Sequence, residues 1–246
     1  MASEWWENFF SGVALDCWRQ AVSDEQTRLE ADFIEQSLGL RPPAKILDAP
    51  CGNGRLSLEL AARGYQMTGI DIAREFLDEA RSKSGERRLA IAWEYRDMRD
   101  LPWQAVFDGA FCFGNSFGYF DDSGNANFLK AVVRSLKSGA RFVLEAAAAE
   151  IVLPIFEPNT MSPVGDILFI EENRYDHAEG RLYTDYTFVR NGKAEKRPGS
   201  QRIYTYRELS HLLEEAGFAD IEAFGSLTKE PYKLGAKRLI LAATKR

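Results

Sequence analysis

Short apolar runs alternate with amphipathic stretches along the chain from Ala44 onward, and this alternation limits the possible folds more than any other feature. Short, continuous apolar runs are typical of strands that are buried on both faces of a sheet. Parallel strands need a crossover between them, which the amphipathic stretches can supply as helices. The pattern therefore predicts an α/β fold in which helices cover both faces of a mostly parallel sheet.

Seven strands are expected in this sheet. The first five are predicted at residues 45–49, 66–71, 90–95, 107–113 and 141–146. Crossover helices are predicted at residues 56–63, 74–83 and 125–136. A further helix at 206–216 precedes strands at 219–224 and 238–243, and the spacing before the last strand suggests that it is reversed and forms an antiparallel edge.

Two segments do not follow the alternation. Residues 1–39 are helical in pattern and rich in aromatic residues, and we expect them to form a lid over the core, which takes up residues 40–246. Residues 147–205 interrupt that core with two β-rich runs, 166–175 and 181–190, joined by turn-forming residues. With a third strand near 200–204, this segment is predicted to be an antiparallel β insertion.

Composition excludes several classes of partner. The net charge is −6, which provides no general attraction to nucleic acid or to anionic lipid, and no run of about 18 apolar residues occurs. Three cysteines without C-x-x-C spacing indicate neither a disulfide framework nor a metal site. We expect a cytoplasmic protein without nucleic-acid, membrane or metal partners, and nothing in the sequence indicates its oligomeric state.

A strand, a glycine-containing turn and a helix follow one another between Ile46 and Ser57. Gly52 and Gly54 lack side chains, so a ligand can approach the backbone of this turn closely. Asp71 lies at the end of the second predicted strand, where a carboxylate can accept hydrogen bonds from ribose hydroxyls. Together these residues predict a site for an adenosine-containing cofactor.

The charge near the turn favours one cofactor over another. A carboxylate at Asp48 would repel a pyrophosphate, and Ser57 stands where a dinucleotide fingerprint has its third glycine. The ammonium and sulfonium of S-adenosylmethionine suit Asp48 instead. A nicotinamide-dependent oxidoreductase is therefore the weaker alternative, and a non-catalytic S-adenosylmethionine-binding protein with a closed acceptor pocket is another.

The turn resembles that of the class I methyltransferases that depend on S-adenosylmethionine, although Pro50 replaces the first glycine of their acidic-x-Gly-x-Gly-x-Gly pattern. The resemblance implies a Rossmann-like core in which Ala49 and Ile72 lie beside the cofactor. It also implies that Asp97 accepts from the adenine amine and that Met98 covers the ring.

Residues 111–120 are similar to the corresponding segment of the glycine and sarcosine N-methyltransferases and of related small-molecule enzymes. That similarity implies cofactor contacts from Phe113 and Asn115, with Asn115 and Tyr119 as catalytic residues beside the transferable methyl. In these relatives an N-terminal helical region touches the methionine moiety, and by order and spacing Trp18 and Arg28 are the candidates here. For the aromatic residues of 111–120, core packing is the alternative.

A small-molecule acceptor is expected, with nitrogen favoured over oxygen. The two histidines, His177 in a turn and His211 on a helix, are poor candidates for a general base. A sulfonium is already a good leaving group, so an amine that arrives unprotonated needs no strong base, whereas a hydroxyl acceptor has more need of one. In the resembling enzymes the insertion covers the acceptor, and its candidate contacts here are Arg174, Tyr175, Tyr183, Tyr186 and Arg202.

Overall fold

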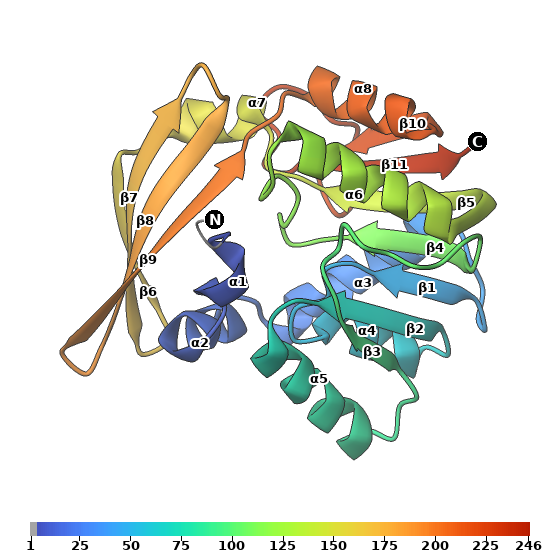
Figure 1. The fold of residues 1–246 in the computed structure, drawn as a ribbon, viewed down its shortest axis with the longest axis horizontal. Helices are drawn as coiled ribbons and strands as arrows, with labels where there is room; N and C mark the ends of the chain where they lie inside the picture. The colour runs from blue at the N-terminus through green and yellow to red at the C-terminus, as the bar shows by residue number, and fades with distance from the viewer. Residues whose placement is uncertain (1–3) are drawn as a thin grey trace.

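The chain folds into a seven-stranded sheet covered by helices and a separate four-stranded sheet beside it (Figure 1). The computed structural model describes residues 4–246, so the first three residues of the expected lid lie outside the described part. Within that part, none of the helices combines the length and the apolar character needed to cross a lipid bilayer.

The central sheet has the strand order β10-β11-β5-β4-β1-β2-β3, and β11 alone runs against the others. Its strands are β1 Lys45–Asp48, β2 Gln66–Asp71, β3 Ala92–Tyr95, β4 Phe107–Cys112, β5 Leu136–Glu145, β10 Phe218–Phe224 and β11 Ile240–Lys245. The expected reversal of the last strand is confirmed, but its expected edge position is wrong. Four consecutive buried residues begin β11, whereas β10 has a single buried residue, Phe218, followed by half-buried and exposed ones, so β10 forms the edge.

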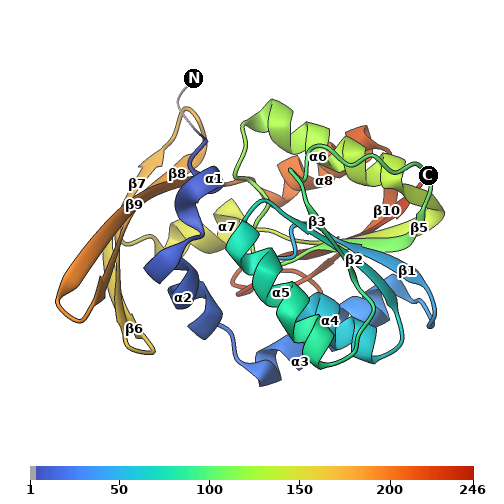
Figure 2. The ribbon, with the colours of Figure 1, turned by 60° about the horizontal axis from the view of Figure 1, so that its bottom comes forward.

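Helices cover both faces of this sheet, as the alternation predicts (Figure 2). Their bounds are α3 Asp24–Leu38, α4 Arg55–Ala62, α5 Arg74–Glu86, α6 Asp122–Ser135 and α8 Tyr206–Ala216. Helix α8 shows how local sequence sets these bounds. Thr205 and Glu208 form a capping box at its start, and Gly217 ends it in the left-handed conformation.

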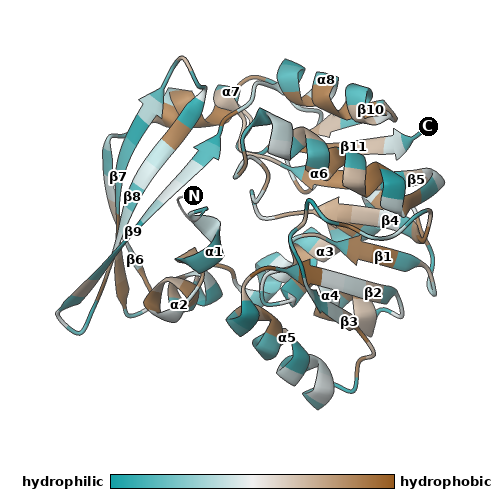
Figure 3. Ribbon diagram, in the orientation of Figure 1, coloured by the Kyte–Doolittle hydropathy of each residue, from teal (hydrophilic) through white to brown (hydrophobic). Residues whose placement is uncertain are grey.

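Successive residues of one strand serve two separate cores. Phe142 of β5 packs in the cluster that contains Phe128 of α6 and Leu213 of α8, while Val143 packs in the cluster that contains Phe33 of α3. Side chains alternate between the faces of a strand, so a continuous apolar run feeds both clusters. Figure 3 shows the result, with hydrophobic colour concentrated on the central strands and mixed colour on the covering helices.

The insertion forms the antiparallel sheet β6-β7-β8-β9. Its elements are α7 Ala149–Val152, a 3-10 turn at Leu153–Ile155, β6 Asn159–Val164, β7 Ile167–Asp176, β8 Arg181–Arg190 and β9 Lys193–Arg202. The predicted hairpin and its turn at 177–180 are confirmed. Sequence analysis missed β6 and most of β9 because both are edge strands that carry proline, and β9 adds two lysines, so neither shows a clear apolar alternation.

Two short helices lie between the two sheets, α1 Trp6–Phe9 and α2 Gly12–Gln20 (Figures 1 and 2). Helix α1 contacts β9 and α2 contacts β8. Phe9 and Cys17 are buried in a cluster with Phe188 of the insertion, so this part of the lid packs against the insertion sheet. In contrast, α3 packs against β4 and β5 of the central sheet.

Candidate functional site

A cavity of about 340 Å³ lies between the carboxyl ends of the central strands and the helices α1 and α2. Parallel α/β sheets place their ligands at this edge because loops and helix N-termini converge there. The strand ends contribute Asp48, Asp71 and Phe113, and the lid contributes Trp6 and Trp18. Expected residues from three separate parts of the sequence thus meet in one cavity.

Asp48 ends β1 and is buried in the cavity wall. Burial raises the pKa of this carboxyl to about 8, although Ser57 and Arg55 both oppose the shift. Ser57 Oγ donates a hydrogen bond to Asp48 Oδ2 at 2.7 Å, so the residue found in place of a third glycine holds this carboxyl. A cation placed in the cavity would favour the ionised form of Asp48.

Asp71 ends β2 and organises the neighbouring turn. Its Oδ2 accepts from the Gly52 amide at 2.7 Å and its Oδ1 accepts from the Ala73 amide at 2.8 Å. A carboxylate oxygen has two lone pairs, so both oxygens retain one for a ligand. Burial raises the pKa of Asp71 to about 6, and the backbone donors limit that rise.

The two glycines of the turn serve different purposes. Gly52 lines the cavity, and a Cβ added there would meet no atom within 4 Å. At Gly54 a Cβ would lie 2.4 Å from Trp93 Cη2 and 3.0 Å from Ala80 Cβ, and Gly54 is not among the cavity-lining residues. The structure thus assigns Gly54 to the packing of α4 against β3 and α5, not to the ligand approach expected from sequence.

The segment after β3 also reaches the cavity, where Asp97 and Met98 are wall residues and Met98 is buried. Asp97 Oδ1 accepts from the Arg99 amide at 2.8 Å, and its Oδ2 pairs with the Arg99 guanidinium at 2.6 Å. Ile72, after β2, lines the same wall. Ala49 does not, because its side chain is buried in the core beneath the turn.

The loop after β4 supplies the wall nearest the insertion, and we refer to residues 114–120 as the β4 loop. Ser116 and Tyr119 line the cavity, whereas Asn115 is exposed, has a φ of +59° and is not among the lining residues. The left-handed backbone at Asn115 turns the chain and directs its neighbours inward. Burial raises the pKa of the Tyr119 phenol above its usual range, so this group is neutral and can donate a hydrogen bond.

The lid contributes a different arginine from the expected one. Trp18 lines the cavity and packs edge-on against Phe9 at 5.4 Å and Tyr186 at 6.0 Å. Arg28 is exposed, because the buried face of α3 is formed by other positions of the helix. Arg19, adjacent to Trp18, lines the cavity instead and is held by Asp16 and Glu79.

A buried ion cluster supports this end of the cavity. Arg55, a lining residue, pairs with Glu30 at 2.6 Å, and Glu30 also pairs with Arg238 at 2.6 Å. Arg238 pairs in turn with Glu145 at 3.0 Å, and Glu145 accepts from the Gly114 amide at 3.0 Å. Burial would raise the pKa of Glu30, but the two arginines bring it below its usual value. The cluster joins α3, α4, β5 and the β4 loop.

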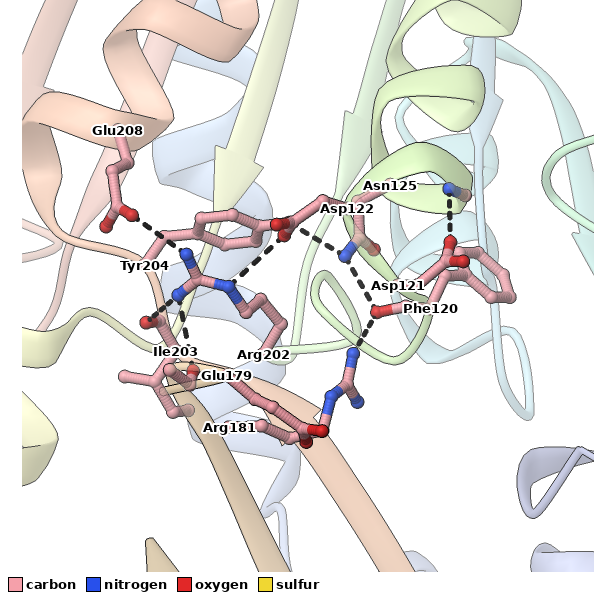
Figure 4. A network of polar contacts seen from close by, with 12 residues as sticks. Phe120, Asp121, Asp122, Asn125, Glu179, Arg181, Arg202, Ile203, Tyr204 and Glu208 are labelled. Atoms are coloured by element: carbon pink, nitrogen blue, oxygen red, sulfur yellow. Dashed lines mark hydrogen bonds and ion pairs between the residues drawn. The ribbon is translucent and has the colours of Figure 1, made fainter. Parts of the chain in front are cut away.

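A second, more open groove of about 900 Å³ lies between the insertion and the core, and Trp6 and Tyr119 line both it and the cavity. Figure 4 shows part of its polar wall, where Arg202 pairs with Glu208 at 2.8 Å and with Asp122 at 3.2 Å. Of the expected acceptor contacts, Tyr175, Tyr183 and Arg202 line this groove. Arg174 instead stacks on Tyr183, and Tyr186 packs against the buried cluster that contains Phe9 and Phe188.

Sequence analysis missed several wall residues, among them Trp6, Phe10, Arg19, Arg55, Phe76 and Phe120. Three of them carried a usable signal. Arg55 directly follows the glycine turn, and Trp6 and Phe10 are four residues apart in an aromatic-rich segment. Arg19 and Phe76 depend on how α2 and α5 lie over the sheet, and Phe120 depends on the path of the β4 loop, which local sequence does not show.

Comparison with known proteins agrees with this geometry. Residues 46–139 match the family model described as a methyltransferase domain. A Bacillus subtilis (strain 168) chain with the name "Putative methyltransferase YqeM" is 26% identical over 96% of both chains. Human glycine N-methyltransferase is 24% identical over 56% of this chain and 53% of its own.

A solved structure extends the comparison to the fold. CalS10, an amino pentose methyltransferase from Micromonospora echinaspora solved with S-adenosylmethionine bound, superposes with a TM-score of 0.69. The match is 19% identical and covers 97% of this chain and 99% of that one. The family match, the full-length relative and the fold agree: residues 46–139 match a methyltransferase domain, and the chain is similar to the class I methyltransferases that use S-adenosylmethionine and shares their Rossmann-like fold.

Proposed function

We propose that this enzyme transfers the methyl group of S-adenosylmethionine to the nitrogen of a small-molecule amine. The observation that carries the proposal is the aromatic junction between the cavity and the groove. Its members are Trp6, Phe10, Trp18, Tyr119 and Phe120, which all line the cavity. Aromatic faces attract cationic groups, and a desolvated site strengthens that attraction.

The residues of the strand-end wall fit the cofactor's functional groups. On this proposal, Asp71 accepts from the ribose hydroxyls, while Asp97 accepts from the adenine amine and Met98 covers the ring. Asp48 faces the cationic methionine end of the cofactor. Arg19, in place of the expected Arg28, pairs with the cofactor's carboxylate. When bound, S-adenosylmethionine supplies a methyl group on a sulfonium, which leaves as the neutral thioether S-adenosylhomocysteine.

The charge of the groove favours an amine acceptor, because the ammonium form is attracted to it and, after that form loses its proton to solvent, the neutral amine accepts the methyl group. Five carboxylates and three arginines line it, which gives a net charge of −2 with His177 neutral. Human glycine N-methyltransferase and the amino pentose methyltransferase are named for acceptors that contain nitrogen. Tyr119 is the acceptor-side catalytic candidate. On this proposal the 147–205 insertion forms the acceptor wall, while residues 40–146 and 206–246 form the cofactor core.

A screen of small-molecule amines, each paired with the alcohol of the same skeleton, tests the proposal by following S-adenosylhomocysteine release. We expect turnover with amines, and a rate that rises with pH while the amine loses its proton. Turnover confined to alcohols would refute nitrogen transfer. Asp71→Ala supplies the background rate because we expect it to lose cofactor affinity.

The role of the aromatic junction has its own matched pair of variants. Tyr119→Phe retains the aromatic face, whereas Tyr119→Leu removes it at similar bulk. We expect the phenylalanine variant to keep the KM for the amine within about threefold and the leucine variant to raise it about tenfold, the equivalent of 1.4 kcal/mol. Equal KM values in the two variants would show that the ring does not recognise the acceptor.

A further inference from the structure

The β4 loop has a backbone that costs free energy to hold. Gly114, Asn115 and Gly118 all have positive φ, at +84°, +59° and +102°. Glycine adopts such a conformation readily, but at Asn115 it costs free energy and persists because surrounding contacts enforce it. Ser116 lies between Asn115 and Gly118, Tyr119 directly follows Gly118, and both line the cavity, so the contacts that hold the loop also set the position of these two side chains.

The insertion makes most of those contacts. Gln201 of β9 donates through Nε2 to the Asn115 carbonyl and to the Phe117 carbonyl, both at 2.7 Å. The Arg202 amide donates to the Gly118 carbonyl at 2.7 Å. Arg181 of β8 donates to the carbonyls of Tyr119 and Phe120. Five carbonyl groups of the loop thus accept hydrogen bonds from β8 and β9.

Direct backbone approach reinforces this attachment. A Cβ at Gly118 would lie 2.5 Å from the Arg202 carbonyl oxygen, so glycine is needed for the strand to come this close. The core holds the other side of the loop through the Gly114 amide and through Asn125, whose Nδ2 donates to the Phe120 carbonyl at 2.9 Å (Figure 4). The loop is therefore clamped between the cofactor core and the insertion.

Gln201 differs from the other members of the clamp. Arg181 and Arg202 line the groove and could contact an acceptor directly, but Gln201 is a wall residue of neither the groove nor the cavity as described for residues 4–246. Its Nε2 carries two hydrogens, which matches the two carbonyls it serves. Any effect of Gln201 on methyl transfer must therefore pass through the β4 loop.

We propose that Gln201 is a positioning residue for methyl transfer, which fixes Ser116 and Tyr119 against the cavity by binding the carbonyls of Asn115 and Phe117. The proposal rests on the proposed function, because Tyr119 is the acceptor-side residue there. Orientation of reacting groups contributes to the rate of the chemical step, whereas the strand-end residues hold the cofactor. Loss of Gln201 should therefore lower kcat and leave cofactor affinity unchanged.

Three variants of the full chain test this inference. Gln201→Met has similar shape and no donor, and Gln201→Lys restores donor hydrogens. Lys196→Met is the control on the same strand, because Lys196 reaches Glu172 and not the β4 loop. With the best amine from the screen, Gln201→Met should lower kcat about 10- to 100-fold, as expected for two lost hydrogen bonds, with the KM for S-adenosylmethionine within threefold.

Gln201→Lys should recover most of this loss, and Lys196→Met should behave as wild type. Unchanged kcat in Gln201→Met, or an equal loss in the methionine and lysine variants, would overturn the proposal. A rise in the KM for S-adenosylmethionine that accounts for the whole loss would also overturn it, because that result indicates a general structural effect.

A second measurement needs no acceptor and separates this inference from the proposed function. Hydrogen exchange of peptides that cover 113–121, with S-adenosylhomocysteine bound, should be at least tenfold faster in Gln201→Met than in Lys196→Met at similar thermal stability. If no amine is methylated but the loop exchanges faster, the proposed function fails while the clamp stands. If exchange in the loop is unchanged, the clamp itself is refuted.

Discussion

Alanine substitutions at Gly52 and Gly54 should separate two roles that the sequence presents as one. Both residues have positive φ, at +54° and +76°. Alanine in this left-handed conformation should lower the free energy of unfolding by roughly 1–2 kcal/mol at either position. The space around the added methyl group differs. It is open at Gly52 and filled by Trp93 and Ala80 at Gly54.

The structure sets the size of the difference. Forcing an extra methyl group into a packed core costs about 1–3 kcal/mol, so Gly54→Ala should lose about 2–5 kcal/mol of unfolding free energy and Gly52→Ala only about 1–2. Cofactor affinity should show the reverse order. Gly52 lines the cavity, and its alanine variant should weaken S-adenosylmethionine binding about tenfold or more, while folded Gly54→Ala should bind within about threefold.

Urea unfolding and calorimetric titration measure both quantities on the same preparations. Trp93→Leu supplies the control, because it removes the ring atoms that the new methyl group would strike. The double variant Gly54→Ala/Trp93→Leu should therefore be less destabilised than the sum of the single variants. Equal stability loss in the two alanine variants, or additivity in the double variant, would refute the packing role of Gly54.

Four further predictions concern the cofactor wall and the lid. Asp71→Ala should raise the Kd for S-adenosylmethionine by the equivalent of about 2–4 kcal/mol, and an unchanged Kd in a folded variant would exclude Asp71 from the site. Because burial raises the pKa of Asp48 to about 8, affinity for the cationic cofactor should increase from pH 6 to pH 8 and then level off, and Asp48→Asn should flatten that titration profile. The contribution of Asp48 to the stability of the unliganded protein should fall over pH 4–8, since the folded state keeps a proton that the unfolded state has lost. Urea unfolding should therefore show wild type losing unfolding free energy relative to Asp48→Asn across this range. Arg19→Ala should weaken binding about tenfold and Arg28→Ala should not, and equal Kd values would refute the lid assignment.

The interior of the central sheet could be predicted from sequence because its signal is local. Strands such as β2 are apolar runs that end in turn residues, and the predicted span 66–71 coincides with the observed strand. Asp48 and Asp71 were locatable for the same reason, since a strand end fixes the position of its last side chain. The edge strands β6 and β9 escaped detection because solvent exposure allows lysine and proline there.

Several site residues were predicted wrongly because their positions depend on how distant segments of the chain pack together. Whether Arg19 or Arg28 faces the cavity depends on how α2 and α3 lie over the sheet, and helical periodicity gives only the relative orientation of residues within one helix. Asn115 was expected in the site because it follows a central strand, but its left-handed backbone turns it outward. Gly54 faces Trp93, a contact made 39 positions further along the chain.

The buried cluster of Glu30, Arg55, Arg238 and Glu145 has a consequence for the order in which the protein can mature on the ribosome. Glu30 and Glu145 are almost fully buried. Glu145 pairs with the guanidinium of Arg238, and Glu30 pairs with that guanidinium as well as with Arg55. Synthesis delivers that arginine more than 200 residues after Glu30, and a buried carboxylate without its partner is strongly destabilising. We therefore expect the cofactor end to close fully only after the segment before β11 has emerged, so that this closure is a late step of folding.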